Sequence, residues 1–301
     1  MLILKLAYND DLSFYKDLEE LKEELKKKEV LIGFIENIEG STHILKIMCD
    51  EELYSERVKE ITNMYVSNIL YRIVIDDYKK KEMLEYLTDN YFFLRQSEMI
   101  EVEENIVKTL KCTDIKENKD NIYCLNRINS IINKINECIS EKQEINIDGF
   151  ITFRMRRLTK EIEKVIDKTI EMYMVEKEYN EFVRLLKYFV DMQECKADEI
   201  NIIIDENDKY RIEDENGKSL YNQFLKELTP DEEKCDINIE DLVISGLITI
   251  SPKNIIIYNK DKCRNKEFLK TIENVFENRV KYNSNINNYL KEKSTDKNID
   301  I

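Results

Sequence analysis

Hydrophobic residues recur along this chain with two periods: alternation, which is typical of half-buried strands, and a spacing of three and four residues, which is typical of helices. In the first seventy residues the two patterns follow each other. A turn-like stretch, Glu39-Gly40-Ser41-Thr42, separates two short apolar segments and predicts a hairpin. The elements that we expect here are a strand at Leu2–Ala7, a helix from about Asp11, the hairpin strands Val30–Ile35 and His43–Met48, and a helix from about Glu51.

The middle of the chain keeps the helical spacing almost without interruption. Residues 111–120 are polar and have no pattern, so they are our candidate for a linker. The helices that we expect lie at Asp77–Leu87, Glu98–Leu110 and about Ile122–Ile139, followed by a long helical pattern from Ile147 to Glu194.

This last pattern contains neither Gly nor Pro after Gly149, and it carries two apolar stripes, from Phe150 to Ile170 and from Phe182 to Val190. As one helix it would be about 65–70 Å long at 1.5 Å per residue. A compact globule of this length has a radius of gyration of only about 19 Å. We therefore expect a break near Val175–Lys177 and an antiparallel or angled pair of helices, with a coiled coil as the alternative.

Strand patterns return after Cys195, and Ser251-Pro252 ends an apolar helical segment, because proline disfavours helical geometry in the residue before it. We expect strands at Glu199–Ile204, Lys209–Glu213 and Asn254–Tyr258, and helices at about Leu220–Leu228, Ile239–Ile248 and Asn265–Phe276.

Together these elements predict an α+β protein that is predominantly helical. The predicted parts are an N-terminal β-α-β-β-α unit with further helices in residues 1–110, a linker at 111–120, a central region of long helices at 121–194, an acidic C-terminal α/β lobe with a short sheet at 195–280, and a frayed tail at 281–301.

The charge of the chain is strongly negative and uneven. Its 301 residues include 47 Lys and Arg against 62 Asp and Glu, a formal net charge of −15. Such a charge repels phosphate backbones and anionic lipid surfaces, so we do not expect the protein as a whole to bind nucleic acid or membranes. Residues 194–241 hold sixteen acidic and six basic side chains, whereas residues 154–168 hold six basic and three acidic ones.

Cysteine usage and the lack of targeting signals indicate a cytoplasmic protein. The seven cysteines form no CxxC pair, which indicates reduced thiols rather than a disulfide framework. Residues 1–6 lack the basic region and the long apolar core of a signal peptide. No run approaches the ~18 apolar residues that a membrane span requires.

Several classes of active site lack the residues that they need. His43 is the single histidine, which leaves no metal-ligand cluster and no serine triad of ordinary form. All five glycines are isolated, so no phosphate-binding loop is present. Asp205–Asp208 resembles a calcium loop, but Lys209 and Tyr210 stand where an oxygen ligand and a glycine are needed. We expect no metal, no cofactor and no catalysis, although 62 acidic residues leave a carboxylate-based enzyme site open.

Three arginines, Arg154, Arg156 and Arg157, stand out in this acidic chain. Arg154 and Arg157 share one face of a helix and could hold a phosphate or an acidic partner. The interpretation that we favour is an internal clamp on the acidic segment 194–241.

Four stretches resemble the YtxC-like family, which is linked to sporulation in endospore-forming Gram-positive bacteria. They are residues 147–154 (IDGFITFR), 175–182 (VEKEYNEF), 186–191 (LKYFVD) and 245–253 (SGLITISPK). Cys195 and Ile250 depart from the family pattern, which has proline and alanine there. The resemblance implies a role in sporulation, but it supplies no reaction, ligand or catalytic residue.

The hypothesis that follows is a non-enzymatic cytoplasmic protein that acts in sporulation through contacts with a protein partner. The residues that we expect at the partner surface are Arg154, Arg157, Lys177, Glu178, Tyr179 and Arg184. The alternatives are a regulator that binds nucleic acid through the helix of Arg154 and Arg157, and an enzyme with a carboxylate-based site.

Overall fold

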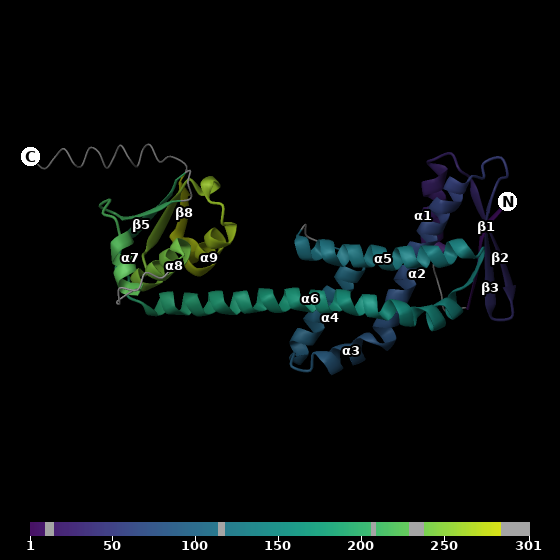
Figure 1. The fold of residues 1–301 in the computed structure, drawn as a ribbon, viewed down its shortest axis with the longest axis horizontal. Coiled ribbons are helices and arrows are strands. Elements are labelled where there is room, and N and C mark those ends of the chain that lie inside the picture. Colours follow the sequence, from purple (N-terminus) through teal and green to yellow (C-terminus); the bar gives the residue numbers. More distant parts are fainter. Residues whose placement is uncertain (10–14, 114–117, 206–208, 229–237, 284–301) are drawn as a thin grey trace, which may run out of the picture. The chain divides into compact units, whose positions relative to one another are not determined.

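The computed structural model describes residues 1–9, 15–113, 118–205, 209–228 and 238–283 (Figure 1). The fold is α+β and predominantly helical, as the sequence predicts. The chain divides into two compact units, Met1–Val175 and Glu176–Ile301. Each unit has its own sheet and its own hydrophobic core.

The first unit joins a four-stranded sheet to a group of helices (Figure 1). The strand order is β2-β3-β1-β4, with β1 antiparallel to β3 and parallel to β4, so that Leu6 pairs with both Leu45 and Ile145. Its elements are β1 (Leu2–Asn9), α1 (Tyr15–Lys26), β2 (Ile32–Glu39), β3 (Thr42–Cys49), α2 (Glu56–Lys81), α3 (Met83–Asn90), α4 (Gln96–Leu110), α5 (Lys119–Glu141) and β4 (Glu144–Asn146). The predicted helix start at Asp11 lies outside the described residues.

Short polar side chains fix where the long helices of this unit begin. The Ser55 hydroxyl accepts a hydrogen bond from the Val58 backbone N at 3.3 Å at the start of α2. Asn118 Oδ1 accepts from the Asn121 backbone N at 2.7 Å at the start of α5. Such caps satisfy backbone N–H groups that have no partner within the helix. The predicted linker at 111–120 therefore ends in the first turn of α5, and residues 114–117 lie outside the described residues.

One helix, α6 (Ile147–Met192), contributes residues to both units. In the first unit its apolar stripe, which includes Leu158, Ile162 and Ile170, is buried in the core with α2 and α5. The predicted stripe from Phe150 to Ile170 is thus a packing face.

The predicted break near Val175–Lys177 and the pair of helices that it implied are wrong, because α6 is a single helix. Nothing in its sequence after Gly149 interrupts backbone hydrogen bonding. The prediction assumed that all residues belong to one globule, whereas the chain forms two units with separate cores.

The second unit is a small α/β lobe. Its sheet has the order β6-β5-β7-β8, in which β5, β7 and β8 are parallel and β6 is an antiparallel edge strand. Its elements are β5 (Glu199–Ile204), β6 (Tyr210–Asp214), α7 (Tyr221–Leu228), α8 (Ile239–Ile250), β7 (Asn254–Tyr258), the 3₁₀ turn η1 (Lys260–Lys262), α9 (Lys266–Phe276), the 3₁₀ turn η2 (Glu277–Arg279) and β8 (Val280–Asn283).

Alternation along β5 explains how this core is built. Ile200, Ile202 and Ile204 point to one face of the sheet and are fully buried against α8, α9 and the end of α6. Residues 281–283 belong to β8 rather than to the predicted frayed tail, because β8 pairs with β7 through backbone hydrogen bonds that need no apolar pattern. Residues 284–301 lie outside the described residues.

Candidate functional site

The part of α6 in the second unit has two apolar faces. The inner face, Val183, Leu186 and Val190, packs into the core of the lobe, and Val190 is 1% exposed. These residues recur every three or four positions, as one side of a helix requires.

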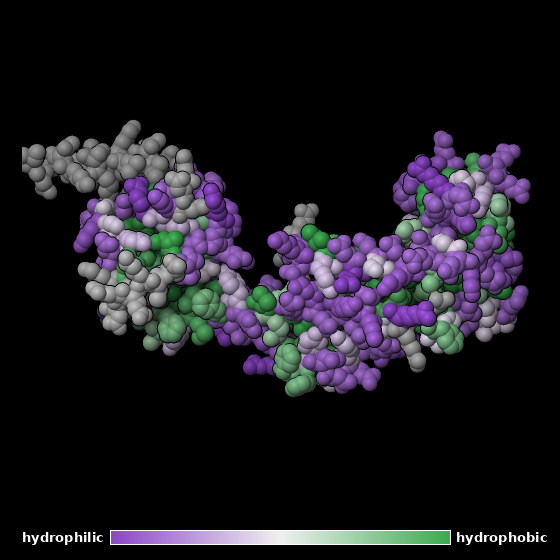
Figure 2. Space-filling view, viewed as in Figure 1, coloured by the Kyte–Doolittle hydropathy of each residue, from purple (hydrophilic) through white to green (hydrophobic). Residues whose placement is uncertain are grey.

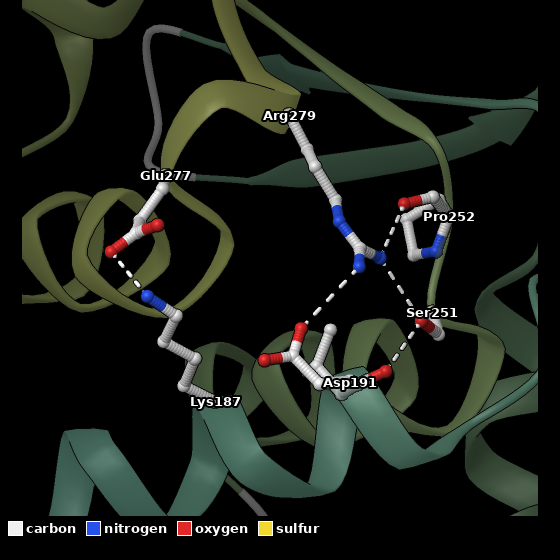
Figure 3. Close-up of polar contacts among 7 residues, drawn as sticks. Lys187, Asp191, Ser251, Pro252, Glu277 and Arg279 are labelled. Atoms are coloured by element: carbon white, nitrogen blue, oxygen red, sulfur yellow. Dashed lines mark hydrogen bonds and ion pairs between the residues drawn. The ribbon is translucent and has the colours of Figure 1, made fainter.

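Two ion pairs along one edge of this inner face link α6 to the lobe (Figure 3). Lys187 Nζ lies 2.5 Å from Glu277 Oε1, and Asp191 Oδ1 lies 3.6 Å from Arg279 Nη2. Both partners, Glu277 and Arg279, belong to the turn η2 between α9 and β8.

Ser251 links the ends of α6 and α8 beside the pair of Asp191 and Arg279 (Figure 3). Its hydroxyl is fully buried, donates to the Val190 carbonyl oxygen at 3.0 Å and accepts from Arg279 Nη1 at 3.1 Å. Arg279 Nη1 also donates to the Pro252 carbonyl oxygen at 3.2 Å. Ser251 closes α8 in the left-handed region, with φ of +47°.

Tyr179 attaches α6 to α9. Its hydroxyl lies 3.3 Å from Thr271 Oγ1 and accepts a hydrogen bond from Asn274 Nδ2 at 3.3 Å. The ammonium of Lys270 lies 5.6 Å from the centre of the tyrosine ring. Together with the ion pairs, these contacts fix the orientation of α6 on its own lobe.

The outer face of α6 consists of Phe182, Leu185, Tyr188, Phe189 and Met192. Their exposed fractions are 52%, 56%, 59%, 53% and 68%. At 3.6 residues per turn these five positions fall within about a third of the helix circumference. Figure 2 shows hydrophobic side chains gathered over the C-terminal part of α6.

Exposure of such an apolar surface to water is energetically unfavourable. Burying one large apolar side chain gains about 1.5–3 kcal/mol, and contiguous exposed patches of this kind mark sites of interaction. A helix that is apolar on two sides is normally covered on both. What the outer face can do chemically is therefore to bind another apolar surface, while the inner face of α6 stays packed in the core of the lobe.

The predicted stripe from Phe182 to Val190 is divided between these two faces. Leu186 and Val190 lie inward, whereas Phe182, Leu185 and Phe189 lie outward. A single packing face spans a little over 100° of a helix. The apolar residues from Phe182 to Val190 cover a wider arc than this, and that width is the feature of the sequence that indicates a second apolar surface.

The residues predicted at the partner surface have different surroundings in the second unit. Glu178 and Arg184 are exposed, and each lies four residues before a member of the outer face, Phe182 and Tyr188. They form a polar border to it. Lys177 Nζ lies 4.0 Å from Glu181 Oε1, and Tyr179 is held against α9 as described above.

The arginine cluster belongs to the first unit. Arg157 is exposed and forms no ion pair with a described residue, while the side chains of Arg154 and Arg156 lie outside the description. The expected clamp on the acidic segment 194–241 stays a prediction.

His43 occupies an ordinary place in the sheet of the first unit. Its Nδ1 lies 2.7 Å from Glu36 Oε1, and its ring stacks on that of Tyr8 with 5.0 Å between the ring centres. The Tyr8 hydroxyl donates to the same carboxylate oxygen at 2.8 Å. In the described part of the chain, no group of three or more His, Cys, Asp or Glu side chains is arranged to hold a metal ion.

No described helix is both long enough and apolar enough to cross a membrane.

Comparisons with known proteins agree on one family. The model of the YtxC-like family matches residues 64–281. The "Uncharacterized protein YtxC" of Bacillus subtilis (strain 168) is 23% identical over 225 residues, which cover 72% of this chain and 75% of the relative. No solved structure matches the chain.

Proposed function

Since the chain belongs to the YtxC-like family, we propose that it is a non-enzymatic cytoplasmic protein that acts in sporulation by binding another protein chain. The binding surface is the outer face of α6. The family resemblance supports the cellular process, and the apolar surface supports the mode of action.

The observation that carries this proposal is an exposed apolar face on a helix whose opposite face is packed into the core of the lobe. Five large apolar side chains are each more than half exposed on one side of a helix whose other side is fixed by Val190, Lys187 and Asp191. A docking site on a rigid element loses little conformational entropy on binding. Glu178 and Arg184 supply the polar rim that protein interfaces have around an apolar centre.

The test replaces two outer-face residues in the gene of the sporulating cell. Leu185→Asp with Phe189→Asp puts two charges at the centre of the face, where a bound chain would exclude water. Because both side chains are exposed, the fold should be unaffected. The matched control is Phe92→Asp, since Phe92 is 80% exposed in the first unit and lies outside the proposed surface.

We expect spore yield to fall to the level of a gene deletion in the double variant and to stay at the wild-type level in the control. Protein levels are measured in both strains by immunoblot. Normal sporulation with a stable double variant would contradict the proposed surface, and normal sporulation after deletion of the gene would contradict the proposed process.

A further inference from the structure

We propose that the outer face of α6 binds the same face of a second copy of this chain, in antiparallel orientation. This inference names the partner of the surface in the proposed function and rests on that function.

The spacing of the outer-face residues is the same when it is read in either direction along the chain, so the face can match an antiparallel copy of itself. Phe182, Leu185, Phe189 and Met192 are separated by three, four and three positions, which is the spacing of the seam between paired helices. The series reads the same in both directions. An antiparallel copy therefore places Phe182 opposite the partner's Met192, and Leu185 opposite the partner's Phe189.

The side-chain sizes also favour this pairing. Each of the four layers sets one aromatic ring against one aliphatic side chain, which fills space better than two rings or two aliphatic groups. The Phe182–Met192 layers add contacts between sulfur and an aromatic ring. Tyr188 falls beside its own copy, where its ring can pack and its hydroxyl can reach water. A parallel pair would set Phe182 against the partner's Phe182 instead.

The area is sufficient for a stable pair. The outer-face residues are 52–68% exposed. At ~200 Å² for each large side chain, two copies would bury roughly 1,200 Å², the lower end of the range for specific interfaces.

The local charge allows self-association although the chain carries −15. Residues 176–192 contain four acidic and three basic side chains. Lys187 and Asp191 are already paired with Glu277 and Arg279. The segments that meet therefore carry a net charge of only −1 each, which causes little direct repulsion between them.

Sedimentation equilibrium of the full chain tests the pairing. We expect the wild type to have twice the mass of the 36.2 kDa chain at micromolar concentration, and the Leu185→Asp/Phe189→Asp variant to have the mass of one chain. Phe92→Asp should remain a dimer. Far-UV circular dichroism of each variant shows that its helices are intact.

A charge pair tests the antiparallel register. Phe182→Lys or Met192→Glu alone should raise the dissociation constant at least tenfold, because each buries an unpaired charge in an apolar layer. The two together should restore dimerisation, since each lysine then faces a glutamate of the partner. In a parallel pair the double variant would set like charges against each other and would dissociate further.

A monomeric wild type would overturn the proposed partner, and a dimer that survives Leu185→Asp/Phe189→Asp would do the same. Neither result decides the proposed function, which rests on spore yield. A monomer whose outer-face variants still lose sporulation would keep the proposed function and show that a different protein occupies the face. Failure of the charge pair to restore the dimer would overturn the antiparallel register.

Discussion

At Ser251, an unfavourable backbone conformation is offset by the hydrogen bonds of the side chain. Its left-handed backbone, with φ of +47°, is unfavourable for a side chain, whereas its buried hydroxyl bonds both Val190 and Arg279. The hydroxyl therefore explains why serine, and not glycine, can stand at the end of α8.

Substitutions at Ser251 distinguish the cost of its left-handed backbone from the stabilisation that its hydroxyl provides. Ser251→Ala should destabilise the second unit by about 1–3 kcal/mol, because it keeps the strain and leaves buried polar groups unpaired. Ser251→Gly loses the same bonds but regains about 1 kcal/mol from the relaxed backbone. Urea unfolding should rank the free energy of unfolding as wild type, then Gly, then Ala. An alanine variant as stable as the glycine variant would contradict this explanation.

Two carboxylates two residues apart on α6 should respond to pH in opposite ways. Burial alone would raise the pKa of Glu161, but Lys164, Lys134 and Arg127 lower it below its ordinary value. Burial raises the pKa of Glu163, and the negative charges of Asp167 and Glu82 raise it further. The charge of Glu161 thus stabilises the fold above its ordinary pKa, whereas the charge of Glu163 destabilises it as pH rises through its raised pKa.

At neutral pH, Glu161→Gln should lower the free energy of unfolding by about 1 kcal/mol, and Glu163→Gln should raise it by about 0.5 kcal/mol. Both differences should vanish in acid, as pH falls below the pKa values of the two carboxyls and the wild-type groups become neutral. Thermal unfolding at several pH values measures both. Equal signs at neutral pH would refute the opposite electrostatic roles of the two residues.

At the scale of elements, much of the lobe follows directly from the sequence. Strands β5 and β7 have the predicted bounds, because short runs of β-branched residues between polar turns strongly favour a strand over a helix. The strands β4 and β8 were missed, since each is short and forms by pairing with a strand remote in the chain. For the outer face, spacing alone did not reveal which of two neighbours, Leu185 or Leu186, meets the core.

The continuity of α6 is a testable property of the element itself. Backbone amides of residues 172–180 should exchange with deuterium much more slowly than those of an unstructured peptide, because they donate to carbonyls four residues earlier. Hydrogen exchange with mass spectrometry resolves this segment. Rapid exchange confined to 174–178 would show that the helix breaks where the sequence first suggested.

At the scale of the whole molecule, the chain consists of two units with separate cores, and α6 contributes to both. The one large apolar surface on α6 in the second unit is not part of either core. In the proposed dimer, the outer face becomes buried only when a second copy binds.

Oxidation of Met192 by dilute peroxide reports that burial directly, since sulfoxide formation follows exposure of the sulfur. Met192 is 68% exposed in the single chain, and Met64, in the first unit, is 39% exposed and serves as the internal reference. As protein concentration rises, we expect the rate of Met192 oxidation to fall in the wild type and to stay constant in Leu185→Asp/Phe189→Asp, with the rate at Met64 unchanged in both. A rate of Met192 oxidation that is independent of concentration in the wild type would contradict burial of the outer face by a second copy.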